Sequence, residues 1–116
     1  MSQDNLFPKA TKETAMKKAD LAPEQIKAWR DFSRAVFKKG VLDEKTKELI
    51  AIAVGHVTQC PYCIKAHIPK AMRKGASKEE IMEAIWVAAE MRAGAGYSYG
   101  NIALAAMEEY EESLNK

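Results

Sequence analysis

The sequence contains little cysteine, little histidine, almost no net charge and no long apolar run. Its 116 residues include two cysteines and two histidines, and 18 lysines and arginines against 16 aspartates and glutamates leave a formal charge of +2. Two cysteines are too few for a disulfide-stapled secreted domain. The near-neutral charge argues against a nucleic-acid-binding protein. Since no stretch approaches the roughly 20 apolar residues of a spanning helix, we predict no membrane segment.

The composition indicates one globular domain. Hydrophobic residues make up 47% of the chain and charged residues 29%, which excludes a disordered or fibrous protein. The polar start Met1–Asn5 is not typical of a signal peptide, so we expect a cytoplasmic protein. We expect a polar, lysine-rich arm or helix over residues 1–20 and one folded domain over residues 21–116.

Apolar residues recur at spacings of three and four along most of the chain, and no stretch alternates convincingly as a strand does. The fold is therefore predicted to be all-α, with five to six helices joined by short connections. A lysine-rich helix is expected near Thr11–Asp20. The next helix is predicted to begin at Pro23 and to end at Gly40, a residue suited to a left-handed cap.

The later helices have recognisable ends. The residues that predict these ends are Asp43 as an N-cap, Pro61 as a helix start, Gly75 as a closing glycine, and Ser77 with Glu80 as a capping box. The chain is expected to break near Thr58–Cys60, with Cys60 at the N-cap of a helix that runs to about Lys74. Arg92–Gly96 is expected to be a flexible joint before a last helix, roughly Tyr99 to Ser113.

The chemistry of the chain is concentrated around Cys60 and Cys63, which lie one helical turn apart and can close a disulfide. The reactive form of a cysteine is the thiolate, and the helix N-terminus favours it at Cys60. His67 lies four residues after Cys63 and can take a thiol proton. Glu48 is the best candidate to orient His67, but along one straight helix it would lie about 18 Å from Cys60. Glu48 reaches the site only if the chain reverses; the alternative is a surface residue.

The pattern Glu48-x11-Cys60-x2-Cys63-x3-His67 resembles the signature of the alkyl hydroperoxidase D and carboxymuconolactone decarboxylase superfamily, and the flanking residues 37–51 and 75–80 agree with it. The resemblance covers about residues 20–110. It implies an alkyl hydroperoxidase D-like helical fold and an obligate homo-oligomer, a trimer or a hexamer. It also implies a thiol-dependent antioxidant oxidoreductase, either a peroxidase or a disulfide reductase.

Carried onto this chain, the resemblance implies that Cys63 exchanges with the partner, that Cys60 is the resolving thiol, and that His67 and Glu48 form a proton relay. Electrons would come from an external thiol or dihydrolipoyl donor, and a peroxiredoxin or lipoyl protein would be the partner. No bound cofactor is expected, because the cysteine pair itself carries two electrons. Tyr62 stands where alkyl hydroperoxidase D has a histidine. The decarboxylase branch lacks the pair, so we do not expect lactone decarboxylation.

Two other interpretations stay open at this point. The side chains of His56, Cys60, Cys63 and His67 are of the types that bind tetrahedral zinc, although the last three share one helical stripe. The cysteine pair could also be an inert part of an oligomeric helical protein, since buried cysteines are common in protein cores.

Overall fold

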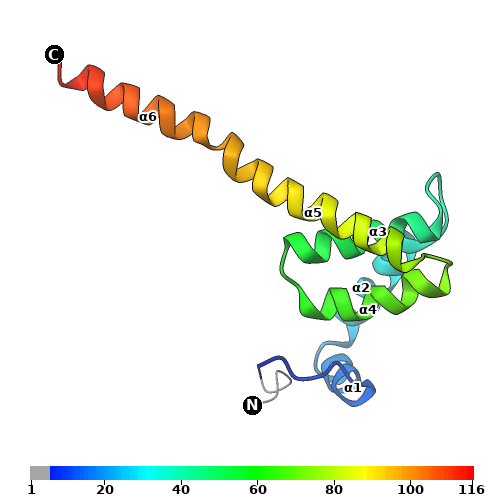
Figure 1. Ribbon diagram of the computed structural model, residues 1–116. Coiled ribbons are helices and arrows are strands. Elements are labelled where there is room, and N and C mark those ends of the chain that lie inside the picture. Colours follow the sequence, from blue (N-terminus) through cyan, green and yellow to red (C-terminus); the bar gives the residue numbers. More distant parts are fainter. Residues whose placement is uncertain (1–5) are drawn as a thin grey trace.

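The computed structural model describes residues 6–116, and this part of the chain forms six α-helices and no strand (Figure 1). The helices are α1 (Lys12–Leu21), α2 (Pro23–Phe37), α3 (Glu44–Val57), α4 (Pro61–Arg73), α5 (Lys78–Ser98) and α6 (Gly100–Ser113). None of them is long and apolar enough to cross a membrane. The all-α prediction is confirmed over this range. The first five residues of the expected arm lie outside the described residues.

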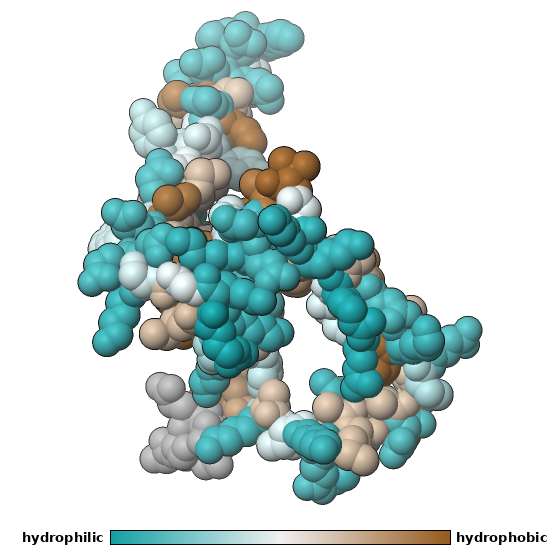
Figure 2. Space-filling model, turned by 90° about the vertical axis from the view of Figure 1, so that its right-hand side faces the viewer, coloured by the Kyte–Doolittle hydropathy of each residue, from teal (hydrophilic) through white to brown (hydrophobic). Residues whose placement is uncertain are grey.

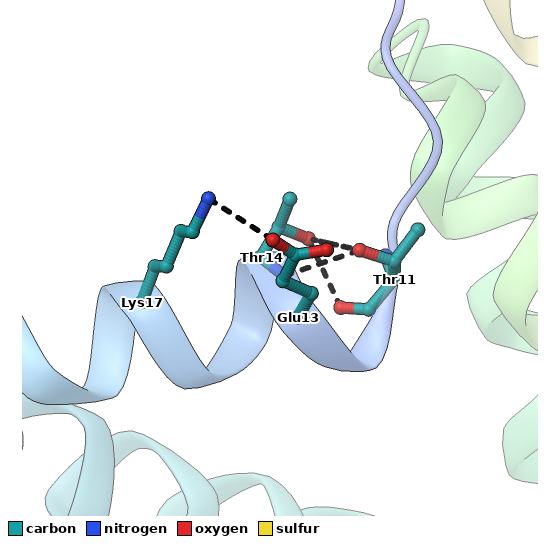
Figure 3. Close-up of polar contacts among 4 residues, drawn as sticks. All are labelled: Thr11, Glu13, Thr14 and Lys17. Atoms are coloured by element: carbon teal, nitrogen blue, oxygen red, sulfur yellow. Dashed lines mark hydrogen bonds and ion pairs between the residues drawn. The ribbon is translucent and has the colours of Figure 1, made fainter.

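Helix α1 is stabilised mainly at its own N-terminus. The side chains of Thr11 and Thr14 each accept a hydrogen bond of 3.1 Å from the backbone N–H of the other, which forms a capping box. Glu13 and Lys17 add an ion pair of 3.2 Å one turn apart, and Figure 3 shows all four side chains. The helix buries no residue, and its main contact is with α2.

The end of α2 differs from the prediction. The helix ends at Phe37, and Gly40 does not adopt a left-handed conformation. Instead, the Lys47 ammonium of α3 donates hydrogen bonds to the carbonyls of Val36 at 2.8 Å and Lys38 at 2.6 Å. A side chain from the next helix thus donates hydrogen bonds to C-terminal carbonyls of α2, which a glycine cap would otherwise pair with backbone N–H groups.

The later helix ends agree with the predicted caps. Asp43 accepts a 2.7 Å hydrogen bond from the backbone N–H of Thr46, and this bond lowers the pKa of the Asp43 carboxyl. Ser77 and Glu80 form the expected capping box. Gly75 closes α4 with a φ of 95°, in the left-handed region where only glycine avoids strain.

The core lies where α3 packs against α4 and α5. Its only fully buried large side chain among the described residues is Ile52 of α3. Around it the buried residues are Ala71, Ala76 and Ile81, with Leu49, Ile68 and Ile85 partly buried against them. This core is small, and it joins α3 to both α4 and α5.

The predicted joint at Arg92–Gly96 is wrong, because α5 continues to Ser98 and the interruption lies at Tyr99. The stretch contains glycine but no proline. A glycine in a helix costs about 1 kcal/mol relative to alanine, yet it keeps its backbone hydrogen bond. Figure 1 shows α5 and α6 running almost in line, as a rod that points away from α2, α3 and α4.

Candidate functional site: a cysteine pair beside a buried Glu–His pair

The chain reverses between α3 and α4 in the short turn Thr58–Cys60. Gln59 has a φ of 57° and is the only non-glycine residue with positive φ in the described range. The Cys60 backbone N–H donates to the Gly55 carbonyl at 2.9 Å and closes the turn. The predicted reversal is therefore present, and it returns α4 along the side of α3.

Cys60 is the N-cap of α4, as predicted, and its Sγ accepts a 3.2 Å hydrogen bond from the Cys63 backbone N–H. Pro61 follows as the first helical residue, where its missing N–H has no consequence. Cys60 and Cys63 are joined by a disulfide, so the structure shows the oxidised pair. When the disulfide opens, a thiolate at Cys60 would face unpaired N–H groups of the helix N-terminus.

Gly55 allows α3 and α4 to approach closely at the cysteine pair. It is buried, and a Cβ placed on it would lie 3.3 Å from Cys63 Cβ and 3.5 Å from Ile64 Cγ1. A larger residue would push Cys63 away from α3. The sequence analysis did not single out Gly55; the available signal was a glycine within an otherwise apolar helix.

Glu48 of α3 and His67 of α4 meet in the structure, with Glu48 Oε2 2.7 Å from His67 Nδ1. The side chains are only 7% and 17% exposed, so the surface alternative for Glu48 is wrong. A buried carboxylate needs such a partner. Because the carboxylate accepts at Nδ1, the neutral imidazole carries its proton there and leaves Nε2 as a proton acceptor.

Phe37 at the end of α2 supports the imidazole from another helix. Its ring stacks on that of His67, with centroids 5.0 Å apart and planes inclined by 26°. Contacts from Glu48 and Phe37 thus fix both the position and the plane of the imidazole. The sequence marked Phe37 only as an apolar helix residue, so this contact was missed.

Cys63 and His67 line the same cavity, which has a volume of about 430 Å³ and falls within the usual range for small-ligand sites. Most of its other walls are apolar and come from α2 and α3: Val36, Phe37, Ile50, Ala51, Val54 and Gly55. Val36, Ile50 and Val54 are roughly half exposed, so the cavity opens on the surface. We call this space the redox cavity. Cys63 and His67 thus contribute to the wall of one space that a small apolar molecule could enter.

Tyr62 lies between the two cysteines but is turned to a different surface. Its hydroxyl donates a 2.7 Å hydrogen bond to the Pro8 carbonyl, and its ring meets Phe7 edge-on at 6.3 Å. It lines a separate cavity with the N-terminal segment and does not line the redox cavity. Tyr62 therefore holds the N-terminal segment against α4.

The geometry gives no support to the zinc hypothesis. His56 Nδ1 hydrogen-bonds the Ile52 carbonyl of its own helix at 2.8 Å. Over residues 6–116, no three histidine, cysteine, aspartate or glutamate side chains are grouped to hold a metal ion. Arg92, the other polar residue near His56, donates to the Val57 carbonyl and so caps the end of α3.

Two ion pairs fix the helices that carry the site. Lys45 and Glu80 lie 2.8 Å apart and join the starts of α3 and α5; this contact raises the pKa of Lys45 and lowers that of Glu80. Lys74 pairs with Glu44 and lowers the pKa of that carboxyl. Neither pair lines the redox cavity, so both act on the positions of the helices.

The chain matches known proteins over most of its length. The model of the carboxymuconolactone decarboxylase family matches residues 23–109. Uncharacterized protein 4 of the cox locus of Paracoccus denitrificans is 58% identical over 84 residues, which cover 72% of this chain and 76% of that protein. An uncharacterized protein of Haemophilus influenzae is 41% identical over 88 residues, 76% of this chain and 75% of that protein.

Solved structures agree with the fold. A carboxymuconolactone decarboxylase family protein from Legionella pneumophila is 36% identical with a TM-score of 0.67, covering 84% of this chain and 87% of that one. A Thermotoga maritima family protein with a suggested role in an antioxidative response is 30% identical with a TM-score of 0.64, covering 86% of each chain.

The fold and the site thus define a small all-α domain with a cysteine pair at a helix N-terminus. This chain belongs to the carboxymuconolactone decarboxylase family, as a short, alkyl hydroperoxidase D-like member that carries Cys60 and Cys63.

Proposed function

We propose that the protein is a dithiol–disulfide oxidoreductase that reduces organic hydroperoxides. The observation that carries the proposal is the redox cavity, in which Cys63 of a redox-competent pair and His67 line one apolar space. His67 is held from behind by buried Glu48, as a general base requires. The mostly apolar lining favours a hydroperoxide with an alkyl or aryl group.

The first half of the cycle consumes the hydroperoxide. His67 Nε2 takes the Cys63 thiol proton, and the thiolate attacks the terminal peroxide oxygen. The O–O bond breaks, the alcohol leaves with the proton from His67, and Cys63 becomes a sulfenic acid. Cys60 then gives up its thiol proton, the Cys60 thiolate attacks Cys63 Sγ, and the displaced hydroxide takes up that proton and leaves as water. The products are one alcohol, one water and the Cys60–Cys63 disulfide, so two electrons have passed to the peroxide.

The second half restores the dithiol with an external dithiol of the dihydrolipoyl class. A donor thiolate attacks Cys63 Sγ, and Cys60 leaves as a thiolate at the N-terminus of α4, where its Sγ already accepts a backbone N–H. The second donor thiol attacks the mixed disulfide, leaves the donor as a cyclic disulfide and returns both cysteines to the thiol form. Glu48 and His67 move the protons, and no bound cofactor is needed.

A trapping experiment tests which cysteine reacts. Reduced Cys60→Ser protein with one equivalent of cumene hydroperoxide should accumulate a sulfenic acid at Cys63, which dimedone captures and mass spectrometry locates. Cys63→Ser should give no such adduct at a comparable rate. Rapid labelling of Cys60 in the Cys63→Ser protein would reverse the assignment, since the helix N-terminus also favours a thiolate at Cys60.

The same thiolate can attack a disulfide, so disulfide reduction is the second candidate. Parallel turnover of cumene hydroperoxide and of oxidised lipoamide against one thiol donor separates the two activities. A peroxiredoxin or a dihydrolipoyl protein stays a prediction as the physiological partner. A mixed disulfide captured on Cys60→Ser protein and identified by mass spectrometry is the test of that prediction.

A further inference from the structure

Helix α6 lacks a partner within its own chain. It has 14 residues, none of them buried, and its main contact is with the end of α5. An isolated helix of this length is marginal in water, so its stability must come from packing. In Figure 1, α6 lies at the far end of the rod, away from the helices that form the core.

An apolar stripe runs along one face of α6. Ala103, Met107, Tyr110 and Leu114 follow one another at spacings of four, three and four, and so form a stripe along one face. Met107, Tyr110 and Leu114 are 57%, 66% and 68% exposed. Figure 2 shows apolar side chains exposed among polar ones on the receding upper part of the molecule. Outside this stripe lie the glutamates Glu108, Glu109, Glu111 and Glu112, together with the exposed apolar side chains of Ile102 and Leu104.

The size of the exposed surface indicates what covers the stripe. The chain exposes 9646 Å² and has a radius of gyration of 20.4 Å. A compact monomer of 12.9 kDa would expose about 6,300 Å² and have a radius of about 13 Å. The excess of about 3,300 Å² in one chain is several times the roughly 800 Å² that each partner contributes to a standard interface. A second copy of this chain is therefore the occupant that the dimensions favour.

The redox cavity is an apolar surface that fits such a helix. Its rim includes the half-exposed side chains of Val36, Ile50 and Val54. The chain's own α6 points away from this rim and does not line the cavity. An apolar stripe from a neighbour would cover the mouth while leaving the interior open to a small molecule.

Charge complementarity supports the same placement. A basic pocket of about 510 Å³ adjoins the redox cavity and shares Phe37 with it. Its basic residues are Arg30, Arg34, Lys38, Lys70, Arg73 and Lys74, against two acidic residues, Glu44 and Glu48. The side chains of Arg30, Lys70 and Arg73 make no ion pair with any described residue. The four glutamates beside the α6 stripe would supply negative charge opposite these unpaired basic side chains.

We propose that α6 of one copy lies across the redox cavity of a second copy, with its stripe on the apolar rim and its glutamates toward the basic pocket. The neighbouring subunit then forms the outer wall of the site and shields Cys63 and His67 from bulk water. This inference concerns the assembly of the subunits, so its tests do not depend on whether the protein reduces peroxides.

Light scattering on purified protein tests the stripe. Met107→Glu with Tyr110→Glu should convert the oligomer to monomer, because two carboxylates would enter the apolar rim. Ala105→Glu is the control, since it introduces a carboxylate on the opposite face of α6, about 180° from the stripe, and should leave the assembly intact. Monomeric wild-type protein at micromolar concentration, or equal loss in both variants, would overturn the proposal.

A charge exchange keeps the test valid even if the stripe variant fails to fold. Glu108→Lys with Glu111→Lys changes only exposed positions and should weaken association at least tenfold at low salt. Adding Arg30→Glu and Arg73→Glu in the same chain should restore most of it. Absence of rescue, with helix content unchanged by circular dichroism, would contradict the predicted charge contact.

Cross-linking locates the contact. A benzoylphenylalanine at position 110, in a mixture of ¹⁵N-labelled and unlabelled chains, should give intermolecular cross-links to peptides that contain Val36, Ile50 or Val54. Cross-links that join α6 only to another α6 or α5, or only within one chain, would show that this surface is not the docking site.

Discussion

Replacing His67 with alanine removes the side chain that connects Glu48 with the redox cavity. The imidazole has Glu48 Oε2 2.7 Å from Nδ1 and shares the cavity with Cys63. Loss of a general base typically lowers the rate by about 10²-fold or more, which equals about 2.7 kcal/mol of transition-state stabilisation. We therefore expect kcat/KM for cumene hydroperoxide to fall by about 10²-fold in His67→Ala.

Glu48→Gln tests whether the carboxylate acts through His67. The amide keeps the size of the side chain and can still hold the ring, but it supplies no charge, so we expect a smaller loss on the order of 10-fold. The double variant should be about as slow as His67→Ala alone, because Glu48 has no other route to the sulfur. Independent effects would instead multiply to about 10³-fold.

The assay follows peroxide-dependent oxidation of dihydrolipoamide in a pH series. His56→Ala is the matched control, because that histidine bonds only its own helix and lines another cavity; it should change kcat/KM less than about twofold, well below the loss of a general base. A fully active His67→Ala, or a Glu48→Gln effect of undiminished size in the His67→Ala background, would refute the relay.

Three further predictions concern stability. Gln59→Gly should raise the free energy of unfolding in urea by about 0.5–1 kcal/mol, because Gln59 has a positive φ, whereas Gln59→Val should lower it; equal free energies would contradict the turn geometry. The pKa values of Asp43, Glu44 and Glu80 are lowered in the folded state, so their contribution is present above the unfolded value of about 4 and is lost as pH falls. Glu80→Gln should reduce that acid loss of stability, and an unchanged pH profile would count against the Lys45 contact. Lys47→Met should lower the free energy of unfolding by about 1 kcal/mol through the loss of the α2 cap.

Local chemistry made several features of the fold predictable. Asp43, Ser77 and Cys60 act on backbone N–H groups within three residues of themselves, so sequence spacing alone identifies them as caps. The meeting of Glu48 and His67 was one of two alternatives that the sequence left open, because Pro61 indicated where the chain could reverse but Glu48 could equally have been a surface residue.

Features that depend on contacts between residues far apart in the sequence could not be predicted from local sequence patterns. Lys47 of α3 caps the C-terminus of α2, and no local sequence pattern indicates that a glycine cap at Gly40 is therefore unnecessary. The continuation of α5 through Arg92–Gly96 reflects backbone hydrogen bonding that outweighs the modest cost of glycine. The close approach at Gly55 and the stacking of Phe37 on His67 exist only once α2, α3 and α4 are packed.

A single-turnover experiment tests the redox role most directly. Reduced wild-type protein is mixed with one equivalent of cumene hydroperoxide, and the Cys60–Cys63 disulfide and cumyl alcohol are quantified over time. The proposed cycle predicts that both appear together in a one-to-one ratio, far faster than peroxide oxidises free cysteine. Thiols that stay reduced, or that oxidise no faster than free cysteine, would contradict it.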